Sequence, residues 1–159
     1  MSGDINISFA KPEEWEAAME LAWRTFLVFE GPEYSQEGID NFLKFISEER
    51  LFQMFLNGEF KLAVAKKDEM IVGVGALRAV SHVSLLFVNK DMHRMGIGRK
   101  LLAFLQEDLE KSGSPKMTVH ASLYGVPFYK RVGFIESGEV KREDGIEYQP
   151  MVCFCKIKN

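Results

Sequence analysis

Cysteine and histidine are scarce in this chain of 159 residues, which has two of the first and three of the second. Cys153 and Cys155 stand two apart in an expected strand, which turns both side chains to one face and disfavours a disulfide between them. No second Cys or His pair stands at metal-ligand spacing, so we expect no metal site. Reduced, buried thiols of this kind favour a cytoplasmic protein.

Long apolar runs and a basic leader are also lacking. No apolar stretch approaches the roughly 20 residues that a membrane-spanning helix requires. The amino terminus has no basic region followed by an apolar segment. The net charge is -3, without the positive balance of a nucleic-acid-binding domain. The sequence therefore predicts neither a membrane nor a nucleic acid as partner.

The overall composition is that of an ordinary globular protein. Hydrophobic residues make up 47% of the chain and charged residues 27%. A length of 159 residues suffices to bury one good core. No repeat, linker or low-complexity tract divides the sequence, so we expect a single domain over residues 1–159.

Charge is unevenly distributed along the chain. The segment from Glu30 to Glu49 contains six acidic residues and one lysine, whereas the segment from Lys90 to Lys100 contains four Lys or Arg residues and one aspartate. Patches of opposite sign suit an anionic cofactor and a cationic substrate. Two solvated faces of opposite sign would give the same pattern, and that alternative stays open.

Apolar periodicity predicts the order of elements. Residues 5–9 alternate as in a strand, and Pro12 opens a helix that ends at Gly31-Pro32. Ser35 is placed to cap a second helix. The later elements are strands over 60–65, 71–77 and 83–88, a helix over 96–111, a strand over 117–121, a helix over 126–131, and strands over 133–137 and 151–157. This order predicts an α/β fold with a mixed, mostly antiparallel central sheet and helices on both faces.

A glycine-rich turn joins the strand at 83–88 to the helix that follows. Gly96 and Gly98 allow a ligand to approach the backbone, and the first N–H groups of the helix have no partner within it. Arg94, Arg99 and Lys100 add positive charge at the same end. The turn therefore predicts an anion site suited to a pyrophosphate.

Three ligand-binding motifs and one structural alternative compete for this turn. A dinucleotide fingerprint fails because Leu101 replaces the third glycine and Lys116 stands where an acid is expected. A phosphate-binding Walker loop fails because no Gly-Lys-Ser/Thr follows. A glycine turn that only caps a structural helix stays open. The third motif is a coenzyme A loop.

Residues His93-Arg94-Met95-Gly96-Ile97-Gly98 resemble the coenzyme A loop of the GNAT acetyltransferases, Gln/Arg-x-x-Gly-x-Gly/Ala, with His93 departing at its first position. Downstream, Phe128-Tyr129, followed by Gly133-Phe134, resembles the later Phe-Tyr-x-x-x-Gly-Phe signature of the same family. Two motifs in the right order are more specific than either alone. The resemblance covers residues from about 5 to 157.

The resemblance implies a GNAT-like fold, acetyl-coenzyme A as acetyl donor and no metal. In that family the sheet splays near the end of the strand at 83–88 and admits the pantetheine arm. Tyr129 matches the tyrosine that protonates the departing thiolate, work that a phenol can do at neutral pH. The residues expected to bind the coenzyme are Phe87, Val88, Arg94, Met95, Gly96, Ile97, Gly98, Arg99 and Ser122, the last of them in place of an asparagine contact that Ala121 cannot make.

The acceptor side is less defined. Its candidates are Glu30 and Glu33, between the first two helices, and His82 and His120, on two strands. His82 and Ser84 are expected on the face opposite to Val83 and Leu85. Which group serves as general base is left open. The implied function is acetyl transfer to a primary amine of a small molecule, by direct attack on the thioester. A protein or peptide acetyltransferase, a non-catalytic acyl-coenzyme A-binding domain and a homodimer remain alternatives.

Overall fold

The structure is a computed structural model that describes residues 4–143 and 145–158. One sheet contains strands in the order β1-β2-β3-β4-β5-β8-β6, and β7 pairs with β8. Only the β4–β5 pair is parallel among the described strands. The strands are β1 (Asn6–Phe9), β2 (Lys61–Lys67), β3 (Met70–Arg78), β4 (His82–Val88), β5 (Met117–Ser122), β6 (Ile135–Glu136), β7 (Lys141–Glu143) and β8 (Ile146–Cys153). The mixed, mostly antiparallel sheet is therefore confirmed.

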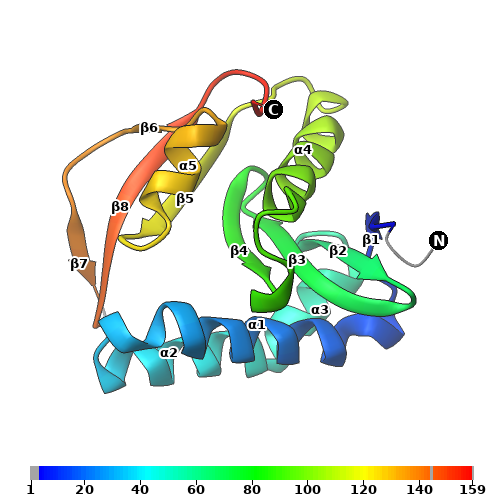
Figure 1. The fold of residues 1–159 in the computed structure, drawn as a ribbon, viewed down its shortest axis with the longest axis horizontal. Coiled ribbons are helices and arrows are strands. Elements are labelled where there is room, and N and C mark those ends of the chain that lie inside the picture. Colours follow the sequence, from blue (N-terminus) through cyan, green and yellow to red (C-terminus); the bar gives the residue numbers. More distant parts are fainter. Residues whose placement is uncertain (1–3, 144, 159) are drawn as a thin grey trace.

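Helices lie on both faces of the sheet (Figure 1). They are α1 (Trp15–Phe29), α2 (Gln36–Ser47), α3 (Glu49–Leu56), α4 (Ile97–Glu110) and α5 (Val126–Val132), with short 3-10 turns η1 (Pro12–Glu14), η2 (Gly31–Glu33) and η3 (Lys90–Met92). The core on the α1 side includes Phe26, Leu62 and Leu85. The core on the α4 side includes Leu101 and Met117.

A glycine lets α4 approach the sheet closely. A Cβ on Gly73 of β3 would lie 3.1 Å from Ile97 Cγ2 and 3.3 Å from Leu101 Cδ1. Any side chain there would therefore push α4 away from the strand. The close approach places the amino terminus of α4 beside the carboxyl end of β4.

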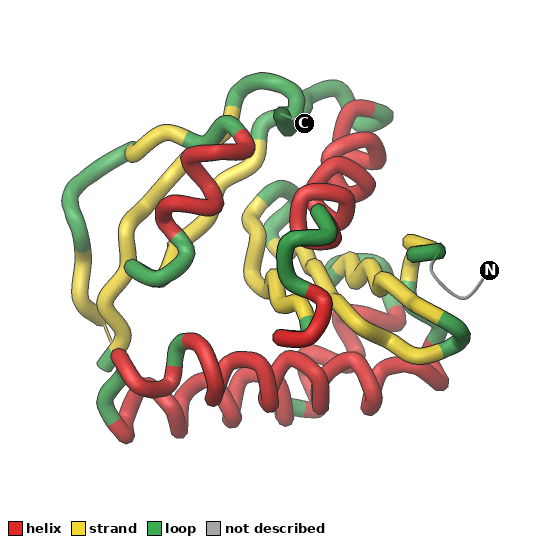
Figure 2. Tube along the Cα trace, in the orientation of Figure 1, coloured by secondary structure: helices red, strands yellow, loops and turns green. Residues whose placement is uncertain are grey.

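The sheet forks between β4 and β5. Only two residue pairs join these strands, His82↔Thr118 and Val83↔Val119. Beyond Val83, β4 continues along β3 while β5 continues along β8 as far as Ser122, and the two halves diverge (Figure 2). The predicted splay is confirmed, and it begins directly after Val83.

A bulge in β4 reverses the alternation of its side chains. Leu77 pairs with Val83 and Ala76 pairs with Leu85, so Ser84 is one extra residue on β4. Val83 therefore lies in the core on the α4 side, whereas Leu85 lies in the core on the α1 side. The prediction that these two residues share a face is wrong, because strict period-two alternation cannot anticipate an inserted residue.

Helices α1 and α2 run across the open end of the fork (Figure 1). Ser35 caps α2 as predicted, since its Oγ accepts a hydrogen bond from Gly38 N at 3.2 Å. The same Oγ donates to Gly145 O at 3.1 Å, in the turn before β8. A Cβ on Gly38 would lie 2.6 Å from that oxygen, so glycine permits the contact. The two halves of the molecule are thus joined at both ends of the fork.

Other expectations for the chain ends and helices need correction. The sequence reading missed α3 (Glu49–Leu56), which follows α2 after one residue. The last strand ends at Cys153, because the following segment turns to α4, where Gln106 Oε1 accepts a hydrogen bond from Ile157 N at 2.9 Å. Cys155 therefore lies outside the strand and is exposed, while Cys153 is buried and free. In the part of the chain that the structure describes, no helix is long and apolar enough to cross a membrane.

Candidate active site

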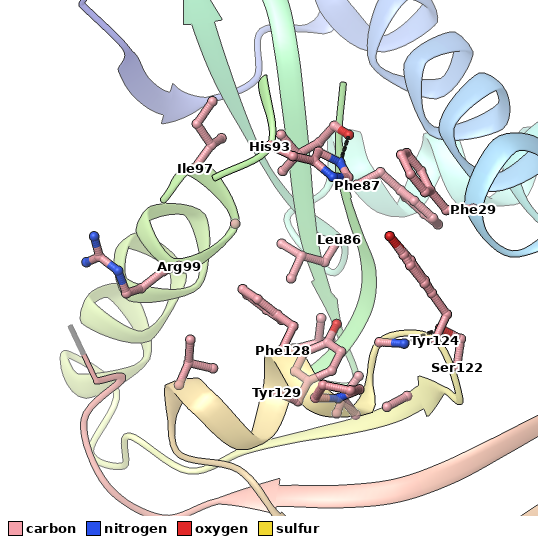
Figure 3. Close-up of a pocket in the computed structure, with 18 of the residues that line it drawn as sticks. Phe29, Leu86, Phe87, His93, Ile97, Arg99, Ser122, Tyr124, Phe128 and Tyr129 are labelled. Carbon is pink, nitrogen blue, oxygen red and sulfur yellow. Dashed lines mark hydrogen bonds between the residues drawn. The ribbon is translucent and has the colours of Figure 1, made fainter. Parts of the chain in front are cut away.

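A cavity of about 790 Å³ lies where β4 and β5 separate. Four parts of the chain wall it: β4, the loop from η3 into α4, the end of β5 with α5, and the last turn of α1 (Figure 3). The sequence motifs lie far apart in the chain, and the fork brings them around one space.

The loop into α4 forms one end of the cavity. Arg94 and Gly96 have φ values of 70° and 73°, so the chain turns sharply before the helix. Helix α4 begins without a side-chain cap, which leaves its first N–H groups available to an anion. A Cβ on Gly98 would lie 3.2 Å from Phe128 Cζ, so the glycine keeps this end uncrowded. Arg99 also lines the cavity, and its guanidinium lies beside Gly96.

The β5-facing edge of β4 forms a second wall. Within the described strands, β4 has no pairing with β5 beyond Val83. Leu86, Phe87 and Val88 line the cavity along this edge. His93 Nε2 donates a hydrogen bond to Val88 O at 2.9 Å, which fixes the end of the strand against the loop. An unpaired strand edge offers alternating N–H and C=O groups to an extended ligand.

Three stacked rings connect the walls of the cavity. The ring of Phe29, at the end of α1, lies 4.6 Å from the ring of His93 and 5.5 Å from that of Tyr124, at interplanar angles of 24° and 15°. His93 belongs to the loop before α4 and Tyr124 to the turn after β5, so Phe29 bridges the two arms of the fork (Figure 3).

Tyr129 projects from α5 into the same space and is 8% exposed. Its ring packs edge-to-face against Phe128 and Phe134. Burial, and then the charge of Glu30, raise the pKa of Tyr129 above its ordinary value. The phenol therefore stays protonated at neutral pH.

Glu30 lines the cavity from the carboxyl end of α1. Burial raises the pKa of Glu30 to about 7, against a hydrogen bond from Tyr34 that lowers it, and the charge of Glu33 raises it further. A carboxyl group with a pKa near neutrality is suited to accept a proton at physiological pH. One cavity thus holds a carboxyl group, Glu30, that can accept a proton near neutral pH, and a phenol, Tyr129, that stays protonated there.

The two strand histidines form a pair beside the fork. Their rings lie 4.6 Å apart, and the His120 ring stacks on Tyr148 at 4.2 Å. His120 lines the cavity, whereas His82 forms a 2.8 Å hydrogen bond with Thr118. Burial lowers the pKa of His82 to about 4 and also lowers the pKa of His120. Both imidazoles are therefore neutral at pH 7.

The cavity brings together most, but not all, of the sequence candidates. Its walls include Glu30, Phe87, Val88, Arg94, Gly96, Ile97, Gly98, Arg99, His120, Ser122 and Tyr129. Three candidates, Glu33, His82 and Met95, are not among the lining residues. Ile97 lines the cavity but is almost fully buried, and its side chain belongs to the core on the α4 side.

The sequence did not predict that Phe29 stacks on His93 and Tyr124, or that Ser84 is an inserted residue on β4. Phe29 lies at the end of the helix that the sequence predicts before Gly31-Pro32, but its partners across the fork do not follow from the sequence. Tyr124 stands just before the second motif, but nothing in the sequence indicates its contact with Phe29.

Comparisons with known proteins agree with this architecture. Residues 30–155 match the family described as acetyltransferase (GNAT) domain. The uncharacterized protein YyaT of Bacillus subtilis (strain 168) is 28% identical over 80 residues, which are 48% of this chain and 54% of that protein. The chain therefore spans about half the length of this curated relative.

Solved structures share the fold at low sequence identity. A GCN5-related N-acetyltransferase from Rhodopseudomonas palustris is 18% identical, with a TM-score of 0.82 and 98% of both chains covered. The PaiA N-acetyltransferase from Thermoplasma acidophilum, solved in complex with coenzyme A, is 20% identical, with a TM-score of 0.75 over 96% of this chain and 99% of that one. With a family match across most of its length and this shared fold, the chain belongs to the GNAT acetyltransferase family.

Proposed function

We propose that this protein transfers the acetyl group of acetyl-coenzyme A to the primary amine of a small cationic molecule. The observation that carries the proposal is the presence of Glu30 and Tyr129 around one cavity at the fork, where burial raises the pKa of Glu30 to about 7 and keeps the phenol of Tyr129 protonated. Family membership supports acetyl transfer as the reaction.

The cavity has the features that acetyl-coenzyme A requires. The uncapped start of α4 suits the pyrophosphate, and Gly98 leaves the approach to it open. The unpaired edge of β4 suits the amide groups of the pantetheine arm. The PaiA structure, which has the same fold, holds coenzyme A. Main-chain groups around Arg94 to Arg99 and near Phe87 and Val88 would bind the coenzyme.

Acetyl-coenzyme A supplies an acetyl group activated as a thioester. Glu30 accepts a proton from the attacking amine, and main-chain N–H groups along β4 stabilise the charge that develops on the carbonyl oxygen. Tyr129 donates its phenolic proton to the departing sulfur. Glu30 gains one proton and Tyr129 loses one, so exchange with solvent restores both groups.

Two features support a small, cationic acceptor. Glu30 and its neighbour Glu33 place negative charge at the end of α1. The contact of Ser35 with Gly145 joins α2 to the β7–β8 turn across the open end of the fork. A connection across that end favours a small amine over an extended peptide as acceptor.

A panel of amines tests the proposal through release of free thiol from acetyl-coenzyme A. Thiol release with a small cationic amine, and none with peptides that carry free amino groups, is the expected result. If acetyl-coenzyme A binds in calorimetry but no amine releases thiol, the protein is a non-catalytic acyl-coenzyme A-binding domain. If a peptide is the best acceptor, the small-molecule assignment is wrong while acetyl transfer stands.

A further inference from the structure

Ser84 occupies an unusual place in the fork. It is the inserted residue of the β4 bulge, and it follows Val83 directly, where pairing with β5 ends. It also lines the cavity. Its Oγ exposes less than 1 Å² and is the one buried side-chain N or O atom without a hydrogen-bond partner among the residues that the structure describes.

Neighbouring hydroxyl groups do have partners. Thr25 Oγ1 donates to Leu21 O at 2.7 Å, and Ser122 Oγ accepts from Gly125 N at 3.0 Å. Thr118, beside the fork on β5, shares a 2.8 Å hydrogen bond with His82. A buried hydroxyl without a hydrogen-bond partner lowers the stability of the free protein. A bound ligand that accepts a hydrogen bond from Ser84 would remove this cost.

We infer that the Ser84 hydroxyl donates a hydrogen bond to the carbonyl oxygen of the bound acyl thioester. This inference rests on the proposed function. The unpaired edge of β4 runs from Val88, beside the phosphate end, back to Ser84, a distance of about 13 Å at roughly 3.3 Å per residue. A pantetheine arm extended along that edge brings its thioester to the fork.

The hydroxyl can turn toward the ligand without losing an existing interaction. Rotation about the Cα–Cβ bond moves Oγ between staggered positions, and no hydrogen bond of Oγ is broken. The carbonyl oxygen is a pure acceptor, so the bond has Ser84 as donor.

The hydroxyl keeps its proton throughout the reaction. The amine nitrogen bonds to the carbonyl carbon, and the C=O electron pair moves onto the oxygen that Ser84 contacts. When the C=O bond re-forms, the C–S bond breaks. The sulfur takes the proton of Tyr129, and the amine proton goes to Glu30. Ser84 therefore contributes most when charge on the oxygen is largest.

Ser84→Ala tests this role without knowledge of the acceptor, because acetyl-coenzyme A carries the thioester carbonyl and free coenzyme A does not. Calorimetry with both ligands gives the ratio of their affinities for each protein. We expect Ser84→Ala to lower the affinity for acetyl-coenzyme A, relative to the affinity for coenzyme A, by about 3- to 10-fold, which corresponds to one neutral hydrogen bond. Turnover with an amine found by the thiol assay should fall by roughly 10². The melting temperature should not fall, because no hydrogen bond is lost.

Thr118→Val provides the matched control. It removes a hydroxyl that has a partner and is not among the cavity-lining residues. We expect it to lower the melting temperature and to leave the affinity ratio unchanged. The opposite responses of the two variants separate a ligand contact from a structural one.

Three results would overturn the inference. If Ser84→Ala leaves both the affinity ratio and turnover unchanged, Ser84 does not contact the thioester, while the proposed function stands. If Ser84→Ala has a lower melting temperature and an unchanged affinity ratio, the Ser84 hydroxyl stabilises the fold and does not contact the thioester. If the unaltered protein binds neither acetyl-coenzyme A nor coenzyme A, the proposed function fails and takes the inference with it.

Discussion

The Tyr34 hydroxyl lies 3.4 Å from Glu30 Oε1, across the 3-10 turn that separates α1 from α2, and donates a hydrogen bond to it. This bond favours the ionised carboxylate, whereas burial favours the neutral acid, and the balance leaves the pKa of Glu30 at about 7. Glu30 is therefore held in one orientation and titrates in the range where a general base is most useful.

Replacing Glu30 by Gln should change the pH dependence of catalysis. As pH rises through about 7, Glu30 loses its proton and becomes able to accept one from the amine. We expect kcat/KM of the Glu30→Gln variant to be lower by 10² or more at pH 8. The ratio of kcat/KM between wild type and variant should rise with pH and level off above 7, because ionisation of the amine itself cancels in the ratio.

Glu33→Gln is the control for that experiment. Glu33 lies three residues away in the same acidic turn but is not among the residues that line the cavity. Its removal should change kcat/KM by less than about 3-fold, since it acts only through the local charge. A ratio for Glu30→Gln that does not vary with pH would assign the base to another group, with His120 as the next candidate on the cavity wall.

The same substitution should alter stability in a defined pH window. The pKa of Glu30 is raised from 4.5 to about 7 in the folded protein. The stability that it contributes is therefore full below pH 4.5 and is lost as pH rises through 7. Gln resembles the protonated acid, so the stability advantage of Glu30→Gln over wild type should grow by roughly 2–3 kcal/mol from pH 5 to pH 8. Urea unfolding of both proteins at pH 5 and at pH 8 measures this change. If the free energies of unfolding of variant and wild type differ by the same amount at the two pH values, burial does not shift the pKa of Glu30.

Tyr129→Phe should separate catalysis from packing. The ring contacts with Phe128 and Phe134 do not involve the hydroxyl, so the melting temperature should change little. Coenzyme A affinity should be retained, whereas turnover should fall by roughly 10², the scale for loss of a general acid. Equal turnover for the two proteins would leave Tyr129 with a packing role alone.

Gly98→Glu should abolish or strongly weaken coenzyme binding. Its Cβ would lie 3.2 Å from Phe128 Cζ, and its carboxylate would face the anion end of the cavity. Gly138→Glu makes the same chemical change where a Cβ meets only Pro150 Cγ at 3.9 Å. Calorimetry should show at least a 10-fold loss of acetyl-coenzyme A affinity for the first variant and none for the second. Equal affinities in two folded variants would place the pyrophosphate elsewhere.

The regular parts of this fold could be predicted from the sequence because their signals are local. Ser35, Gly31-Pro32 and the alternation in β2 mark element ends and faces within a few residues. The fork itself was expected only from the family resemblance, because nothing within residues 83–88 indicates that β5 pairs with Val83 alone among them.

The missed features depend on contacts between distant segments. The β4 bulge is set by its register with β3, and the end of β8 is set by Gln106 on α4. The Phe29 bridge joins the end of α1 to two loops that are distant from it in the chain. Hydrophobic periodicity describes one segment at a time, so it does not contain this information.

The interrupted pairing of β4 also bears on aggregation. A strand edge with free N–H and C=O groups is normally a hazard at the rim of a sheet, where another chain can add a strand. Here the free edge lies in the middle of the sheet, between β3 and the diverging β5, with α1 and α2 across its open end. This edge faces the cavity and not the rim of the sheet. The protein can therefore keep unsatisfied backbone groups ready for binding without exposing them to intermolecular strand pairing.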